Sequence, residues 1–171
     1  MVHRTFLTTV ITVLVLSVLS CAADSEQALD AYFDETGPHL NRATDAFDAW
    51  TVSADNFADA DLTSISSADY RELAEQHLGV ARVAQRAARE ALAGIRVIVP
   101  PEACDEIHAS LIEALRLSEQ GFLEIVSYMQ AGLRGVEPDE SQRLLGNDLL
   151  ADSDRTKEEA LILMARSPEC S

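Results

Sequence analysis

Four long stretches of the chain carry apolar residues at the spacing of an amphipathic helix. The first runs from about residue 25 to 54, where apolar or small residues recur at steps of four and three, which places them along one helix face. The members of this stripe are Leu29, Phe33, Thr36, Leu40, Ala43, Phe47 and Trp50. The stripe keeps its phase across Pro38, so the pattern predicts one helix kinked at the proline and not a turn.

Similar stripes and end signals predict three more helices, over about 66–96, 101–135 and 138–167. Ser66 is a suitable N-cap for the second, and Gly135 is a suitable terminator for the third. Helices of about 30 residues are each about 45 Å long. Short connections between helices of equal length predict an all-α fold, an antiparallel up-down-up-down four-helix bundle.

The segment before this bundle has the composition of an export signal. Arg4 precedes an almost wholly apolar run over residues 6–19, and the small residue Ser20 follows it. A basic start, a short apolar run and a small residue before the cut are typical of a secretory signal peptide. The run is about 14 residues, short of the roughly 20 that a membrane-spanning helix needs.

The run closes with Val18-Leu19-Ser20-Cys21, which resembles the lipobox of bacterial lipoproteins. That motif has an aliphatic residue three positions before a cysteine and a small residue directly before it. The resemblance covers residues 1–21 and implies cleavage before Cys21 and lipid on its sulfur. An ordinary signal peptide, cut at an A-x-A-like site, is the alternative. The predicted organisation is a cleaved signal peptide over 1–20, a tether over 21–25 and a bundle domain over 26–171, anchored in the cell envelope on the extracytoplasmic side.

The charge of the chain limits its partners. The formal net charge is −16, with a single lysine, Lys157, and removal of the signal segment takes away only the basic Arg4. Nucleic-acid binding requires basic patches, and so does docking on anionic headgroups by charge. We therefore expect no nucleic acid, and membrane contact only through the lipid on Cys21.

Two cysteines remain after Cys21. Cys104 lies at the start of the third predicted helix and Cys170 just past the end of the fourth, which brings them to the same end of an up-down bundle. An exported chain with two such cysteines is expected to pair them. The bridge would close a loop of 66 residues and contribute about 4 kcal/mol by the chain-entropy model.

Candidate metal and cofactor sites are weak. His39, His77 and His108 fall at different heights along the predicted helices, and the chain has no pair of the Glu-x-x-His motifs found in di-iron bundles. We interpret them as core or boundary histidines, with His39 facing out, and expect no metal and no cofactor. Acidic residues are instead concentrated at the end of the bundle away from the tether. Their spacing does not match that of an EF-hand calcium loop. They form a candidate surface for a basic partner or a divalent cation: Asp55, Asp59, Asp61, Glu137, Asp139 and Glu140.

The function hypotheses follow from these features. No set of acid, base and nucleophile emerges, so we expect no enzyme activity. The first hypothesis is a membrane-anchored lipoprotein whose non-catalytic helical bundle serves interaction or scaffolding in the cell envelope. The alternative is a bundle that binds a small ligand or a divalent cation, either at the acidic surface or in a polar cleft near Ser153 and Thr156.

Overall fold

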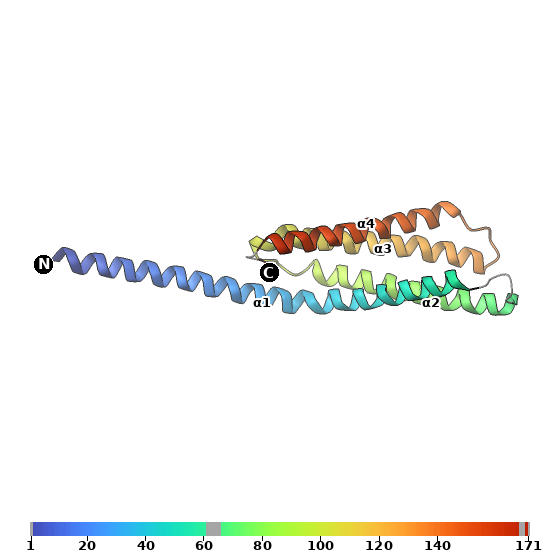
Figure 1. Ribbon diagram of the computed structural model, residues 1–171, viewed down its shortest axis with the longest axis horizontal. Helices are drawn as coiled ribbons and strands as arrows, with labels where there is room; N and C mark the ends of the chain where they lie inside the picture. Colours follow the sequence, from blue (N-terminus) through green and yellow to red (C-terminus); the bar gives the residue numbers. More distant parts are fainter. Residues whose placement is uncertain (1, 61–65, 168–169, 171) are drawn as a thin grey trace.

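The computed structural model describes the backbone of residues 2–60, 66–167 and 170, and within those ranges the side chains from residue 26 onward. This part of the chain is helical and contains no strand. Its elements are α1 (Val2–Asp59), α2 (Ser67–Ile95), the 3₁₀ helix η1 (Glu102–Cys104), α3 (Asp105–Leu133) and α4 (Glu140–Arg166). The four α-helices pack against one another (Figure 1), which confirms the predicted all-α helical bundle.

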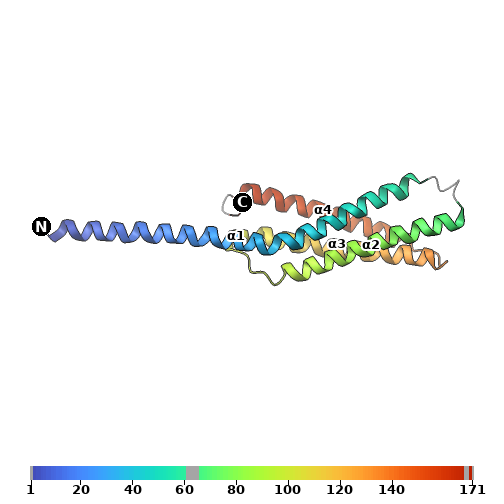
Figure 2. The same cartoon turned by 90° about the horizontal axis from the view of Figure 1, so that it is seen from below.

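Helix α1 is a single helix of 58 residues whose N-terminal part extends beyond the other three helices (Figures 1 and 2). Pro38 lies inside it, as the unbroken stripe predicts. Two predicted limits are wrong. The helix ends at Asp59 and not at residue 54, and residues 21–25 are helical, because they contain alanines and no glycine or proline. The side chain of Cys21 lies outside the described part of the chain, so cleavage and lipidation stay predictions.

Helix α2 begins where the sequence predicts and presents a face of small residues. The Ser66 hydroxyl oxygen accepts a hydrogen bond from the Asp69 amide at 3.2 Å, which satisfies one free N–H of the first turn. The buried face is mostly alanine: Ala74, Ala81, Ala84, Ala87, Ala88 and Ala91. These small side chains let neighbouring helices approach closely. His39 packs directly over Gly94, where an added Cβ would collide with the imidazole ring, so the expectation that His39 faces out is wrong.

Helices α3 and α4 are joined by a glycine turn. Gly135 has a φ of +72°, and the Val136 amide donates to the Ala131 carbonyl at 3.0 Å, the arrangement of a Schellman cap. Helix α4 begins at Glu140, two residues later than predicted, because Asp139 is its N-cap and accepts from the Ser141 amide at 2.9 Å.

The packing of α4 against α3 is close enough to change which residues are buried. Gly121 and Gly146 meet at the crossing, where a Cβ on Gly146 would lie 2.9 Å from the Gly121 carbonyl oxygen. Gly146 is buried there, and the neighbouring apolar side chain of Leu145 is 49% exposed. A pattern of apolar side chains does not predict this contact between two glycines, because glycine has no side chain.

The two remaining cysteines lie at disulfide distance, as the sequence predicts. The Cα atoms of Cys104 and Cys170 are 5.5 Å apart, and their sulfur atoms are within bonding distance. Both are fully buried, in a cluster with Tyr32 and Ile107. The contact joins η1 to the segment that follows α4, so it connects the start and the end of the α3–α4 pair.

Candidate functional site

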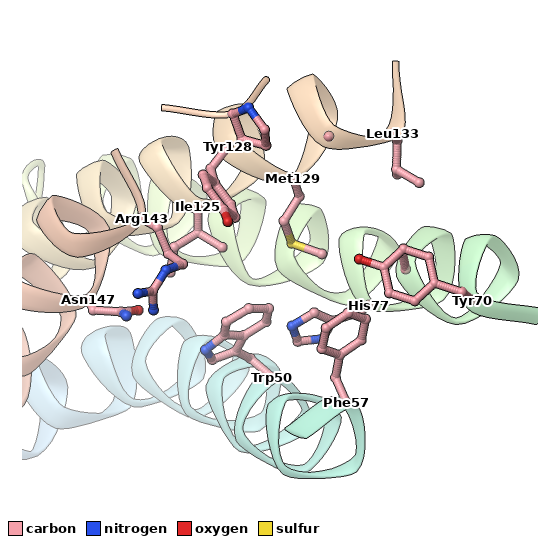
Figure 3. Close-up of a pocket in the computed structure, with 13 residues that line it drawn as sticks. Trp50, Phe57, Tyr70, His77, Ile125, Tyr128, Met129, Leu133, Arg143 and Asn147 are labelled. Carbon is pink, nitrogen blue, oxygen red and sulfur yellow. The ribbon is translucent and has the colours of Figure 1, made fainter. Parts of the chain in front are cut away.

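A cleft of about 430 Å³ opens at the end of the bundle away from the N-terminal extension of α1 (Figures 1 and 3). The end of α1, the start of α2, the end of α3 and the start of α4 each contribute to it. We call it the aromatic cleft and define it by its lining residues: Trp50, Phe57, Tyr70, Ala74, His77, Ile125, Tyr128, Met129, Gly132, Leu133, Pro138, Arg143 and Asn147. Its size lies within the range of small-molecule sites.

One wall of the aromatic cleft is a stack of three rings. The imidazole of His77 lies between the indole of Trp50 and the ring of Phe57. The ring centroids of His77 and Trp50 are 4.4 Å apart with 16° between the planes, and those of His77 and Phe57 are 4.9 Å apart with 15° between the planes. The Ser53 hydroxyl is 2.8 Å from His77 Nδ1, which fixes the orientation of the imidazole. Because His77 is buried, its pKa is lowered from the ordinary value, and the ring is neutral at pH 7.

The floor of the cleft continues into the hydrophobic core. Trp50 meets the edge of Phe122 with ring centroids 5.6 Å apart, and Ile125 and Met129 of α3 lie beside it. Phe122 is almost fully buried. The aromatic wall is therefore held by core packing and by the hydrogen bond from α1, which makes the cleft a pre-formed surface and not a gap between loose side chains.

The side of the cleft next to Trp50 carries polar side chains. Figure 3 shows Tyr128, Arg143 and Asn147 together on the side away from Tyr70. Arg143 Nε donates to Glu140 Oε1 at 2.7 Å, and this hydrogen bond is the main reason that the pKa of Glu140 is lowered. The pKa of Tyr128 is raised, first by burial and then by the negative charge of Glu140.

A second, smaller cavity of about 290 Å³ lies between α1 and α2, and His77 lines it as well. Its other lining residues come from the two helices alone: Ala49, Val52, Ser53, Asn56, Leu73, Gln76 and Val80. Most of its walls are aliphatic or amide groups. It offers no charged group for recognition among these residues, so the aromatic cleft is the stronger candidate.

The five acidic residues of the predicted partner surface that the structure describes are exposed, and they do not converge on a cation site. Asp55, Asp59 and Glu137 lie at the bundle end that carries the cleft, while Asp61 lies outside the described residues. Asp139 is used as the N-cap of α4, and Glu140 is paired with Arg143. Within the described ranges, no three acidic, histidine or cysteine side chains are grouped as metal ligands. Arg143 therefore offsets part of the negative charge at this end, which the sequence analysis did not consider.

The polar middle of α4, the other predicted location for a ligand, is engaged inside the bundle. Ser153 Oγ donates to the Ala114 carbonyl at 2.8 Å and lies 2.7 Å from Ser118 Oγ. Thr156 donates to the carbonyl of Asp152 in its own helix. The bonds of Ser153 join α4 to α3 and the bond of Thr156 stays within α4, so the polar residues of α4 have partners inside the bundle.

The three histidines described have separate partners. His77 belongs to the aromatic stack, and His39 packs on Gly94. His108 Nδ1 lies 3.2 Å from the Tyr32 hydroxyl in the buried layer near Cys104. Burial lowers the pKa of His108, and the charge of Asp105 partly opposes that shift.

The sequence analysis missed the cleft because the first stripe places Trp50 on the helix face that packs into the core. One signal was available: the steps of four and three in the first stripe continue through Ala54 to Phe57, past the predicted helix end. The arrangement that results can hold a small molecule with an apolar body and one polar group. Comparisons with known protein families, curated proteins and solved structures find no match to this chain.

Proposed function

We propose that this chain is a lipid-anchored, non-catalytic helical bundle that binds a small apolar ligand in the aromatic cleft, on the extracytoplasmic side of a membrane. The observation that carries the proposal is the cleft itself: about 430 Å³, lined mainly by aromatic and aliphatic side chains, with a few polar groups on one side. Sites of this composition are typical of small-molecule binding. Of the two hypotheses from the sequence, interaction or scaffolding and ligand binding, the cleft favours the second.

The topology proposed for the bundle is antiparallel up-down-up-down, and cross-helix contacts support it. His39 packs on Gly94 while Ser53 bonds to His77, so residue numbers rise along α1 as they fall along α2. In α3 and α4, Gly121 meets Gly146 while Ser118 meets Ser153. With this topology, the aromatic cleft is proposed to lie at the end of the bundle far from Cys21.

The anchor proposed is lipid on Cys21 after removal of residues 1–20, and its support is the lipobox resemblance. Among the residues whose side chains are described, none of the helices has an apolar stretch of the length that a membrane span requires. Leu29 of α1 packs on the buried cluster near Cys104, and Cys21 precedes it by eight residues. A chain that starts at Cys21 therefore keeps the whole bundle and is joined to it by a short helical segment.

A protein partner, if the bundle has one in the envelope, is proposed to be basic and to dock on the acidic surface. Asp55, Asp59 and Glu137 are exposed at the cleft end, and a basic partner would relieve their mutual repulsion, which acts over about 8 Å at physiological salt. Replacing Asp55, Asp59 and Asp61 together by Asn tests this. Unchanged recovery of envelope proteins by the variant would reject the partner surface without affecting the cleft.

The ligand proposal is tested with a neutral dye. The soluble form, residues 21–171 with Cys21→Ser, is titrated with N-phenyl-1-naphthylamine, whose fluorescence rises in apolar surroundings. We expect one saturable site per chain. Gly132→Phe should abolish it, because Gly132 lines the cleft and a Cβ added there would meet only the Pro138 ring within 4 Å, at 3.5 Å. The phenylalanine ring therefore has room to enter the cleft and fill it.

Gly79→Phe is the matched control for this test. Gly79 is also a helical glycine, has nothing within 4 Å of an added Cβ, and does not line the cleft. The dye should bind this variant as it binds the parent chain. If dye binding is absent from the parent, or survives in both variants, the cleft is not a ligand site. Helix content by circular dichroism verifies that each variant is folded.

A further inference from the structure

We propose that the aromatic cleft selects apolar ligands that carry a carboxylate, and that Arg143 is the group that recognises it. This inference rests on the proposed function and names the ligand class of the same site. A lone apolar cleft would accept any ligand of suitable size, whereas a fixed positive charge on one side gives it a preference in chemistry and orientation.

The position of Arg143 is the first argument. Among the lining residues, Arg143 is the only side chain that carries a full charge at neutral pH, and its ion-pair partner Glu140 does not line the cleft. Figure 3 shows the guanidinium extending from α4 toward Trp50, beside Asn147. A ligand that lies against the ring wall would therefore meet the guanidinium of Arg143.

The donor count of Arg143 is the second argument. A guanidinium has five N–H donors. Here Nε and Nη2 both donate to a single oxygen, Oε1 of Glu140, so Nη1 takes part in neither bond. Arginine suits carboxylates because its planar fork can donate two parallel hydrogen bonds. The ligand carboxylate can therefore bind to Arg143 while Glu140 holds the other side of the guanidinium in place.

The remaining polar groups agree with an acceptor on the ligand. Asn147 lies on the same side of the cleft as Arg143, and its side-chain amide is a hydrogen-bond donor. The hydroxyl of Tyr128, on the same side, is hydrogen-bonded to Glu140. The other side carries Met129, Leu133 and Phe57, with the hydroxyl of Tyr70 as its polar group. An amphiphilic acid fits this division, with the carboxylate toward α4 and the apolar body between the ring stack and α3.

A cationic ligand is the competing class, because aromatic rings attract cations and the chain has a net charge of −16. Two observations oppose it. Trp50 and Phe57 each have one face covered by His77, and Arg143 places a like charge beside any cation in the cleft. The acids at this end of the bundle, Asp55, Asp59 and Glu137, do not line the cleft, whereas Arg143 does. The local charge therefore decides the preference.

The test compares three probes with the same eight-carbon chain: octanoate, octanamide and octylammonium. Each is titrated into the soluble form by calorimetry, and Trp50, the single tryptophan of the chain, reports entry into the cleft by its fluorescence. We expect octanoate to bind about tenfold or more tightly than octanamide, since a hydrogen bond to a charged group is worth at least that factor. Octylammonium should bind most weakly.

Two variants assign the preference to Arg143. Arg143→Gln should bind octanoate and octanamide equally, and Arg143→Lys should keep part of the preference. Arg71→Gln is the matched control: it makes the same charge change in an exposed ion pair, with Glu75, on a residue that does not line the cleft. It should leave the preference intact.

The outcomes separate this inference from the proposed function. If octanamide and octylammonium bind as tightly as octanoate, or more tightly, the carboxylate preference is wrong and the cleft remains a ligand site. If Arg143→Gln retains the preference, Arg143 is not the recognition group. If none of the three probes and no neutral dye binds, the proposed function fails together with the inference.

Discussion

The imidazole of His77 lies face to face with the indole of Trp50, with ring centroids 4.4 Å apart and planes 16° from parallel. The contact joins the end of α1 to the start of α2, and Phe57 covers the other face of the imidazole. When the chain folds, this imidazole loses its contact with water and instead contacts two aromatic rings and the hydroxyl of Ser53. The neutral ring tolerates that exchange better than the charged ring, so the stack ties the stability of the cleft to pH.

The first prediction is that acid destabilises the bundle through His77. Its folded pKa is below the ordinary value near 6.5, so the unfolded chain binds the proton more readily than the folded chain. The stabilisation is fully present above pH 6.5 and is lost as pH falls through 6.5 toward the folded pKa. Urea unfolding between pH 7.5 and 5 measures it. His77→Gln should show a smaller loss than the parent chain.

The same direction holds for His108, whose pKa is also lowered by burial. His108→Gln should therefore remove a further part of the loss, and the double variant should remove both parts, because the two rings lie in different layers of the bundle. Above pH 7, the free energy of unfolding should change with pH in the same way in the parent chain and in the variants. An unfolding free energy that falls equally with acid in the parent and the double variant would exclude both histidines as the cause.

The second prediction concerns the α3–α4 crossing. Gly146→Ala places a Cβ 2.8 Å from Ile125 Cγ1 and 2.9 Å from the Gly121 carbonyl oxygen. The helices must move apart, at a cost of about 1–3 kcal/mol. Gly79→Ala is the control, in open space within α2, and should stabilise by about 0.5–1 kcal/mol from helix propensity alone. A Gly146→Ala variant as stable as the parent would mean that the crossing is looser than this geometry.

The sequence predicts the helices of this fold well, because their signals are local. The stripe through Pro38, the Ser66 cap and the Gly135 turn each depend on neighbours in the chain, and each is present. The position of the cleft is not local. It depends on the approach of α3 to α4 at Gly121 and Gly146. It also depends on Phe57, which lies beyond the predicted end of the first helix at residue 54. Those features become visible only when the helices are placed together.

The candidate site shows the same limit. The acidic surface could be identified from composition, but the use of Asp139 as a cap and of Glu140 as the partner of Arg143 depends on where α4 begins. The pairing of Cys104 with Cys170 was predictable, because both positions are set by helix ends and the bundle topology fixes which ends meet. The position of Arg143 in the cleft could not be predicted, because a charged residue in a helix usually faces solvent.

The third prediction is that Cys104 and Cys170 are covalently paired in the mature protein. Neither should react with iodoacetamide without denaturant and reductant. Reduction should lower the melting temperature by roughly 10 °C, because the bridge closes a 66-residue loop worth about 4 kcal/mol in the unfolded chain. Cys104→Ser should match the doubly substituted chain in stability. Alkylation of both residues in the native protein would show that the thiols are free.

The fourth prediction tests the anchor. If Cys21 carries lipid, Cys21→Ser should leave the precursor uncut or release the protein into the soluble fraction, because the remaining acidic chain has no charge attraction to anionic headgroups. Fractionation of cells with detection of precursor and mature sizes measures this. Cys104→Ser is the matched control, since it makes the same chemical change in the bundle and should leave the protein in the membrane fraction at mature size.

The size of the product separates lipidation from the alternatives. A lipid-anchored parent should label with a fatty-acid analogue, and the label should disappear in Cys21→Ser and persist in Cys104→Ser. An ordinary signal peptide would give a soluble mature parent with no label, because cleavage there does not depend on the cysteine. A Cys21→Ser protein that stays with membranes at mature size contradicts anchoring through Cys21. Something other than lipid on residue 21 would then hold the mature protein at the membrane.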